Sequence, residues 1–267
     1  MFCASAARFV FVFLCLSILP RVFAQDPVAA TRQLPPNTSR TSVPVLVELF
    51  TSEGCSSCPP ADILLQRLDD NQPIPGTQLI VLSEHVTYWD QEGWKDPNSS
   101  SAFTYRQSVY ALGVREPYTP QFVVDGSQSV SLEKVKSLEQ ALNKAKGNAK
   151  IPVRIRNVTV DPSGPATLHA HIEADNTDQH NAEIYLAVAL NHVESQVLRG
   201  ENGGRHLVHV AVVQQLNKVR KLPKGKSFAQ DVQVKPKANE DPRSIRVVVF
   251  AQEPGQGKLI GAAVQKF

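Results

Sequence analysis

Cysteine and methionine are scarce in this sequence, and most of them lie near its start. The 267 residues include four cysteines and one methionine, and Cys3, Cys15 and Met1 all fall within residues 1–24. Beyond residue 24 only Cys55 and Cys58 are left. A disulfide between such close neighbours stabilises little through chain entropy, so this pair excludes a disulfide-stapled scaffold and indicates chemistry instead.

A strong excess of one charge is also missing. Lysine and arginine total 28 against 25 aspartates and glutamates, and two of the arginines, Arg8 and Arg21, lie before residue 25. The remaining chain is almost neutral, which argues against nucleic acid as a partner.

The one marked apolar run lies at the N-terminus. Phe9 to Pro20 follows Arg8, and small residues stand near Ala24, which is typical of a signal peptide cleaved before Gln25. The run is too short for a transmembrane helix, which needs about 20 residues. The sequence therefore predicts a signal peptide over residues 1–24, a flexible leader over 25–42 and a secreted or periplasmic protein without a stable membrane span.

Cys55 and Cys58 stand between a predicted strand and a predicted helix. Val45 to Phe50 is apolar and β-prone, and Pro59-Pro60 opens a run with helical spacing of leucines. Unpaired N–H groups at a helix N-terminus favour a thiolate, the reactive form of cysteine. We expect Cys55 to be the more exposed, attacking thiol and Cys58 to be the resolving thiol.

The segment from residue 43 to 148 alternates strands and helices. After the cysteine helix come a strand at 79–85, a helix at 103–112, a strand at 121–124 with an Asp125-Gly126 turn, and a helix at 132–145. This order resembles the thioredoxin fold. The resemblance implies that Pro120, in Thr119-Pro120, is cis and faces the cysteine pair, with the backbone of Thr119 free to pair with a substrate.

The segment from residue 149 to 267 has a different pattern. Seven runs of strand length, separated by turn residues, predict an antiparallel β-sandwich. These runs are 151–160, 166–173, 183–191, 206–213, 227–234, 244–252 and 258–264. The predicted fold class is thus an α/β thioredoxin-like domain (43–148) followed by an all-β sandwich domain (149–267).

Several motifs together resemble one family. They are Glu48 to Asp62 around the cysteines, Tyr88-Trp89-Asp90, Gly93-Trp94-Lys95-Asp96, Tyr118 to Gln121, and Arg199 to Arg205 in a glycine-rich turn. The chain is similar to the secreted, thioredoxin-like bacterial family called domain of unknown function 1223. The resemblance implies export and supplies no substrate. It also suggests that the Arg199–Arg205 turn contacts the thioredoxin-like domain.

The predicted site consists of Cys55, Cys58, Thr119 and Pro120. We expect thiol–disulfide exchange with exported protein thiols or disulfides, with no cofactor and no metal ion. Two alternatives stay open: a module that binds Cu(I) through the two thiolates, and a non-enzymatic binding protein with a structural disulfide. His85 either approaches this site as a base or metal ligand or is an ordinary packed histidine. Substrate, reduction potential and oligomeric state do not follow from the sequence.

Overall fold

We describe the fold from a computed structural model of the chain. The structure describes residues 1–2, 42–110, 117–131, 135–161, 167–235 and 241–267. The chain divides into two units, Met1–Thr31 and Arg32–Phe267, and every element below belongs to the second. The predicted signal peptide and leader lie almost entirely outside the described residues, so both stay predictions.

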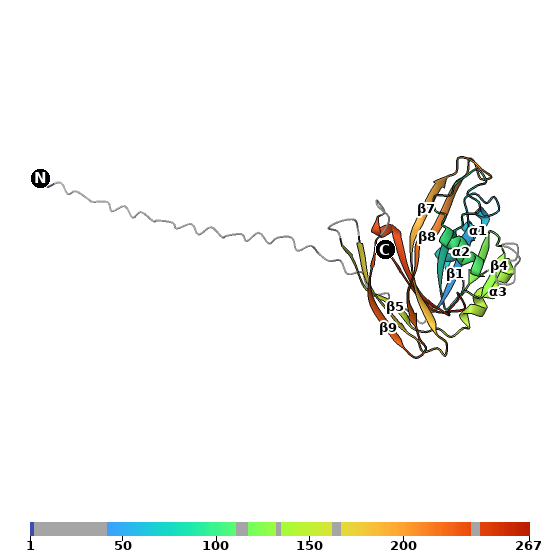
Figure 1. The fold of residues 1–267 in the computed structure, drawn as a ribbon. Coiled ribbons are helices and arrows are strands. Elements are labelled where there is room, and N and C mark those ends of the chain that lie inside the picture. The colour runs from blue at the N-terminus through green and yellow to red at the C-terminus, as the bar shows by residue number, and fades with distance from the viewer. Residues whose placement is uncertain (3–41, 111–116, 132–134, 162–166, 236–240) are drawn as a thin grey trace. The chain divides into compact units, whose positions relative to one another are not determined.

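A large mixed sheet organises the described part of the chain (Figure 1). Its strands, in spatial order, are β11 (Leu259–Lys266), β10 (Ile245–Gln252), β7 (Ala182–Gln196), β8 (His206–Leu222), β2 (Thr77–His85), β1 (Val43–Thr51), β3 (Gln121–Val124) and β4 (Gln128–Ser131). The pairs β1–β2 and β2–β8 are parallel, and the other neighbours are antiparallel. A second sheet contains β5 (Val153–Asp161), β6 (Thr167–Asp175) and β9 (Ser227–Val234).

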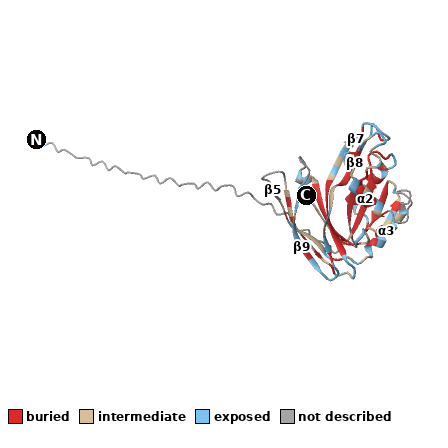
Figure 2. Ribbon diagram, in the orientation of Figure 1, coloured by how far each residue is buried: buried red, intermediate tan, exposed pale blue. Residues whose placement is uncertain are grey.

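Helices cover the end of the large sheet that holds β1 to β4 (Figure 1). They are α1 (Pro59–Asn71), α2 (Ser101–Tyr110) and α3 (Val135–Lys146), and a short 3-10 turn, η2 (Pro242–Ser244), precedes β10. In Figure 1 β5 and β9 lie on the far side of β7 and β8 from these helices. Buried residues concentrate in the strands of the large sheet, whereas much of β9 is exposed (Figure 2).

Side chains that alternate along β1 enter two different cores. Val45, Val47 and Leu49 pack with apolar residues of α1 and α3. Leu46 points to the opposite face, where it joins a core that contains Tyr185 of β7 and Phe250 of β10. Because successive side chains of a strand point to opposite faces, a strand covered on both sides needs an almost unbroken apolar run.

The predicted fold class is wrong. The chain does not form an α/β thioredoxin-like domain followed by a separate sandwich, because strands from both predicted segments share one sheet: β8 pairs with β2 at Val212 and Ser83. This pairing covers an edge of β2 that would otherwise leave backbone polar groups unpaired. The boundary at residues 148 and 149, as a statement about folding units, stays a prediction.

The local predictions hold better than the architecture. All seven strands expected after residue 149 are present, but they divide between the two sheets, and β7 and β8 extend well past their predicted ends at 191 and 213, to Gln196 and Leu222. The turn between β3 and β4 lies at Asp125 and Gly126, both with positive φ, as expected for a tight hairpin. Among the described residues no helix has the length and apolar character needed to cross a membrane.

A buried ion pair joins α1 to the C-terminal strands. Both carboxylate oxygens of Asp69 accept hydrogen bonds from the Arg246 guanidinium, at 3.0 and 2.9 Å, and Lys266 adds a half-exposed partner. Burial raises the pKa of Asp69, but the two cations outweigh that effect and lower it below its usual value.

We expect Asp69→Asn to lower the free energy of unfolding by about 3 kcal/mol, because Arg246 would stay buried without its anionic partner. The difference in free energy of unfolding between the wild type and this variant should be present above the unfolded pKa of aspartate, near 4. It should fade as the pH falls through the lower folded pKa. Urea unfolding followed by circular dichroism measures it. Asp70→Asn, at the exposed neighbouring position, is the matched control; equal stability of the two variants would contradict the prediction.

Candidate functional site

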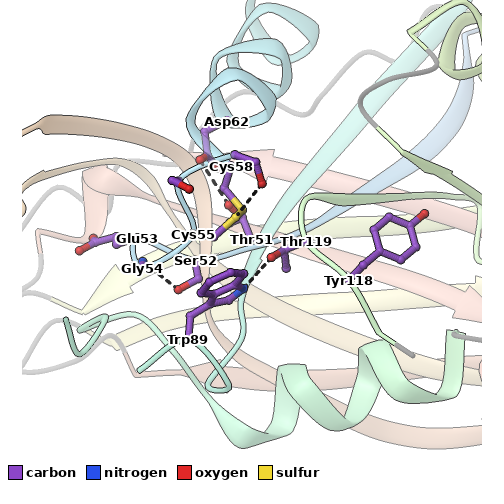
Figure 3. Close-up of a disulfide and its surroundings, with 12 residues drawn as sticks. Thr51, Ser52, Glu53, Gly54, Cys55, Cys58, Asp62, Trp89, Tyr118 and Thr119 are labelled. Atoms are coloured by element: carbon purple, nitrogen blue, oxygen red, sulfur yellow. Dashed lines mark hydrogen bonds between the residues drawn. A yellow bond between two sulfur atoms is a disulfide. The ribbon is translucent and has the colours of Figure 1, made fainter. Parts of the chain in front are cut away.

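The two predicted cysteines form a disulfide between β1 and α1 (Figure 3). Their sulfurs are 2.10 Å apart, and Cys58 is the N-cap residue of α1. The carbonyl oxygen of Cys58 accepts hydrogen bonds from the backbone N–H groups of Ala61 and Asp62. The predicted strand–turn–helix arrangement around the pair is therefore confirmed. It places the pair beside the positive end of a helix dipole.

Both cysteines are fully buried, with 0 % exposure each, whereas Ser56 and Ser57 between them are exposed. The expectation that Cys55 would be the more accessible thiol is therefore wrong. Gly54 shows how closely this segment is covered, because a Cβ at that position would lie 3.0 Å from Cβ of Trp89.

The predicted proline lies on the segment beside the disulfide. The Thr119–Pro120 peptide bond is cis, as the resemblance implied, and Pro120 is buried. The Thr119 hydroxyl accepts a hydrogen bond of 2.7 Å from the indole N–H of Trp89, and Figure 3 shows both residues next to the cysteines. The suggested pairing of the Thr119 backbone with a substrate stays a prediction.

The glycine-rich turn between β7 and β8 reaches the same place. The side-chain amide of Asn202 donates hydrogen bonds to the carbonyl oxygens of Glu53, at 2.8 Å, and Cys55, at 2.9 Å. The carboxylate of Glu201 accepts one from the backbone N–H of Ser56, at 3.2 Å. The suggested contact between this turn and the segment 43–148 is therefore present, and the structure places it at the cysteine-bearing turn.

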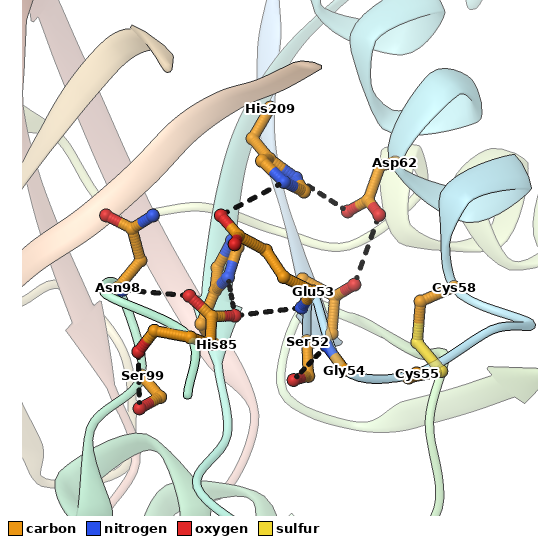
Figure 4. Close-up of polar contacts among 12 residues, drawn as sticks. Ser52, Glu53, Gly54, Cys55, Cys58, Asp62, His85, Asn98, Ser99 and His209 are labelled. Atoms are coloured by element: carbon orange, nitrogen blue, oxygen red, sulfur yellow. Dashed lines mark hydrogen bonds and ion pairs between the residues drawn. A yellow bond between two sulfur atoms is a disulfide. The ribbon is translucent and has the colours of Figure 1, made fainter. Parts of the chain in front are cut away.

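A buried polar cluster lies behind the cysteine pair (Figure 4). The His209 ring, from β8, lies 3.5 Å from the Asp62 carboxylate and 3.8 Å from that of Glu53. Glu53 also accepts a hydrogen bond of 2.7 Å from the Trp94 indole, and Asp62 accepts one of 3.3 Å from the Thr51 hydroxyl. The cluster thus joins the turn before Cys55 to the helix after Cys58.

His85 and Asp96 extend this cluster as an ion pair of 2.7 Å, and neither side chain is exposed. Burial lowers the pKa of His85, but the charge of Asp96 and its hydrogen bond raise it above the ordinary value. Burial raises the pKa of Asp96, but His85 and the backbone N–H groups of Glu53 and Asn98 bring it down to about 2. The interpretation of His85 as a packed histidine fits its burial, and the cluster places it close to the site as well.

Several buried polar atoms of this cluster have no hydrogen-bond partner, among them both ring nitrogens of His209, Nε2 of His85 and Oε1 of Glu53. Within the described ranges, no three histidine, cysteine or carboxylate side chains are arranged to hold a metal ion.

Sequence reasoning missed most of this cluster. Asp62 and Asp96 were noticed only as parts of motifs, and His209 only as a residue of a predicted strand. A histidine on the apolar face of a strand, in line with Leu207 and Ala211, was the available signal, because such a position predicts burial.

A second buried cluster of charged residues surrounds Glu48, within β1. The Arg106 guanidinium donates a 2.6 Å hydrogen bond to Glu48, and both residues contact the Tyr110 hydroxyl. Glu84, on β2, lies 3.6 Å from Arg106. Burial raises the pKa of Glu84 well above its ordinary value, and the nearby Glu48 charge adds to that effect.

An open cleft of about 460 Å³ lies between the start of α1 and the start of β8. Asp62 and His209 line it, together with Arg205, His206 and Ile63, whose side chain is half exposed. The buried cluster behind the cysteines therefore has two members that also face a surface cleft.

Comparison with solved structures finds a relative of this fold. Protein AGR_C_4864 from Agrobacterium tumefaciens is 23% identical, with a TM-score of 0.63 over 85% of this chain and 96% of that one, which is a likeness of fold alone. A β-glucuronidase from Bacteroides uniformis is 15% identical, with a TM-score of 0.26 over 44% of this chain and 13% of that one. A putative ApaA protein from Bordetella pertussis is 15% identical, with a TM-score of 0.22 over 45% of this chain and 96% of that one. Both are too dissimilar to support an argument.

Comparison with curated proteins finds no match. A family model described as "Protein of unknown function (DUF1223)" matches residues 46–252.

Proposed function

The chain belongs to the DUF1223 family of proteins of unknown function, as its motifs predicted, and we propose that it carries out thiol–disulfide exchange with other exported proteins through Cys55 and Cys58. The proposal is supported chiefly by one observation: beyond residue 24 the chain has two cysteines, and they form a disulfide at the N-terminus of α1. That position stabilises a thiolate, which is the attacking species in exchange.

The proposed exchange has two steps. The Cys55 thiolate attacks a partner disulfide, forms a mixed disulfide and releases one partner sulfur as a thiolate, which takes up a proton. Cys58 then loses its proton and attacks the Cys55 sulfur, which releases the second partner sulfur. The protein ends as the disulfide, and the partner gains two electrons and two protons. The reverse sequence oxidises a partner dithiol.

Surrounding groups support both steps. Ser57 places its hydroxyl 3.4 Å from the Cys55 sulfur. Asp62, one helical turn after Cys58, and His209 lie 3.5 Å apart behind the pair and keep its surroundings polar. Under this proposal Thr119 and Pro120 border the substrate, and export to a secreted or periplasmic location supplies partners whose cysteines form disulfides.

The test is a comparison of single cysteine variants expressed with their export signal. Cys58→Ser should accumulate covalent, reductant-sensitive adducts with other proteins, because nothing then resolves the mixed disulfide. Cys55→Ser should accumulate few. Non-reducing gels and mass spectrometry of the purified protein measure the adducts.

Ser56→Ala, at an exposed position between the two cysteines, is the matched control and should form no more adducts than the wild type. If Cys58→Ser forms no adducts while its Cys55 thiol reacts with an alkylating reagent, the proposal is wrong. A redox titration then sets the direction for an active protein: a midpoint above about −230 mV indicates an oxidant or isomerase, and one near about −270 mV a reductant.

A second candidate function is a binding protein whose disulfide is structural. The complete burial of both cysteines favours it. In that case the wild-type bond should resist millimolar dithiothreitol in the folded protein, and neither cysteine variant should form adducts.

A further inference from the structure

The turn between β7 and β8 is a preformed unit, which we call the hairpin tip (Val197–Arg205). Backbone hydrogen bonds close it at Val197 and Arg205, and another joins Gly203 to Gly200. The structure describes every residue from Leu198 to His206, and Asn202 is the only buried residue among them. The hairpin tip therefore buries the Asn202 side chain toward the cysteine-bearing segment, while its other residues from Leu198 to Arg205 are exposed.

Glu201 and Asn202 hold the peptide unit between Cys55 and Ser56 at both of its polar ends. Asn202 donates to its carbonyl oxygen at 2.9 Å, and Glu201 accepts from its N–H at 3.2 Å. Asn202 donates also to the carbonyl oxygen of Glu53. The hairpin tip thus restrains the turn that carries the first cysteine.

The hairpin tip is anchored on its other side by close backbone packing. Gly200 has φ +74°, and a Cβ there would lie 3.0 Å from the Glu92 carbonyl oxygen and 3.1 Å from Cβ of Trp94. Only glycine combines this backbone conformation with so close an approach. The tip therefore bridges the loop around Trp94 and the turn before Cys55.

The burial of both cysteines prevents disulfide exchange in this conformation. An attacking sulfur must reach one of the cysteine sulfurs directly, and both cysteines are 0 % exposed. Some part of the cover has to move first. The hairpin tip is the candidate, because apart from Asn202 its members from Leu198 to Arg205 are exposed.

We propose that the hairpin tip is a gate over the Cys55–Cys58 disulfide, opened by a partner polypeptide whose N–H groups replace those of Asn202. The identity of the partner rests on the proposed exchange function, whereas the gate itself does not. Opening removes the donor from the carbonyl oxygens of Glu53 and Cys55. A partner that covers these oxygens again excludes water from them, so it must supply N–H donors of its own. A polypeptide backbone does so, and a small disulfide without N–H groups does not.

The gate is tested on the purified, oxidised protein by its rate of reduction with dithiothreitol. Asn202→Ala removes two hydrogen bonds that hold the tip down, so we expect reduction to become at least about tenfold faster. Circular dichroism at the same temperature shows whether the variant is folded. An unchanged or slower rate in a folded Asn202→Ala variant would overturn the gate.

A matched pair of glycine variants provides a second, independent test. Gly200→Ala should also accelerate reduction, because its methyl group would unseat the tip from Glu92 and Trp94. Gly204→Ala carries the same added methyl at φ +84°, but apart from its two chain neighbours no atom lies within 4 Å of its Cβ position. It should therefore leave the rate within about twofold of the wild type. Equal rates for the two glycine variants would overturn the gate even if Asn202→Ala failed to fold.

The partner class is tested on the reduced protein with two oxidants. One is a disulfide-linked dimer of a short cysteine peptide, and the other is dimethyl disulfide, which has no N–H donors. The wild type should prefer the peptide by at least about tenfold, and Asn202→Ala should lose most of that preference; equal reactivity of the wild type toward both would overturn the partner class. These readouts are separate from adduct formation. If Cys58→Ser forms adducts and Asn202→Ala is reduced at the wild-type rate, the exchange function stands and the gate is wrong. If Cys58→Ser forms no adducts and Asn202→Ala is reduced faster than the wild type, the gate stands and the exchange function is wrong.

Discussion

Replacing Arg106 by methionine is expected to lower the free energy of unfolding by about 3–5 kcal/mol, because the change leaves Glu48 buried without its cation. Glu48 is fully buried and receives a 2.6 Å hydrogen bond from Arg106. The guanidinium also lies 5.0 Å from the ring centroid of Tyr110 and 5.4 Å from that of Phe250. Urea unfolding followed by tryptophan fluorescence measures the loss.

Glu84→Gln is the informative comparison. Burial and the Glu48 charge raise the pKa of Glu84, which favours its uncharged form, so an amide at this position should cost less stability than the loss of Arg106. A raised folded pKa gives stability that is present at low pH and is lost as the pH rises through the folded value. Glu84→Gln should therefore lose less stability than the wild type on the alkaline side.

Ser108→Ala, at an exposed position of the same helix, should change the stability by less than about 0.5 kcal/mol. If Arg106→Met costs no more than this surface control, the Glu48–Arg106 pair does not carry the stability assigned to it.

Asp96→Asn is expected to lower the free energy of unfolding by about 2 kcal/mol near neutral pH. The folded pKa of Asp96 is about 2, below its usual 3.8, and the difference corresponds to that free energy. The lowered pKa gives stability that is present above the unfolded value and is lost as the pH falls toward 2. The gap between wild type and variant should therefore close in acid.

The same gap should also narrow in alkali, because His85 is the partner. Its raised folded pKa gives stability that is present below the unfolded value, about 6.5, and is lost as the pH rises through the folded value. Unfolding measured from about pH 2 to about pH 9 should show the largest difference between roughly pH 4 and pH 6.5. A difference that does not depend on pH would contradict the ion pair.

Glu92→Gln is the control for this series, since Glu92 is an exposed carboxylate of the same loop. Its difference from the wild type should be small at every pH. Asp96 also accepts a hydrogen bond of 2.9 Å from the backbone N–H of Glu53. Asp96→Asn thus reports on the support of the turn that carries Cys55, as well as on the ion pair.

The sequence by itself determined the local elements and the family. Apolar periods predicted the strands at 45–50, 79–85 and 121–124, and the seven strands after residue 149, because each period depends only on neighbouring side chains. Pro59-Pro60 set the start of α1, and Asp125-Gly126 set the turn between β3 and β4. The motifs between Glu48 and Gln121, together with the Arg199–Arg205 turn, indicated the family, and its model matches residues 46–252.

Only the tertiary structure decided how these elements pair and what surrounds the cysteines. Backbone hydrogen bonds between strands are the same for every sequence, so no local pattern shows that β8 pairs with β2 at Val212 and Ser83. That one pairing merges the two expected domains into a single sheet. It also runs β8 past the cysteine turn, and so places His209 between Asp62 and Glu53 and the hairpin tip over Cys55. Burial and electrostatic contacts depend on this long-range packing, and for that reason the sequence predicted a reactive cysteine pair but could predict neither its cover nor the charged cluster behind it.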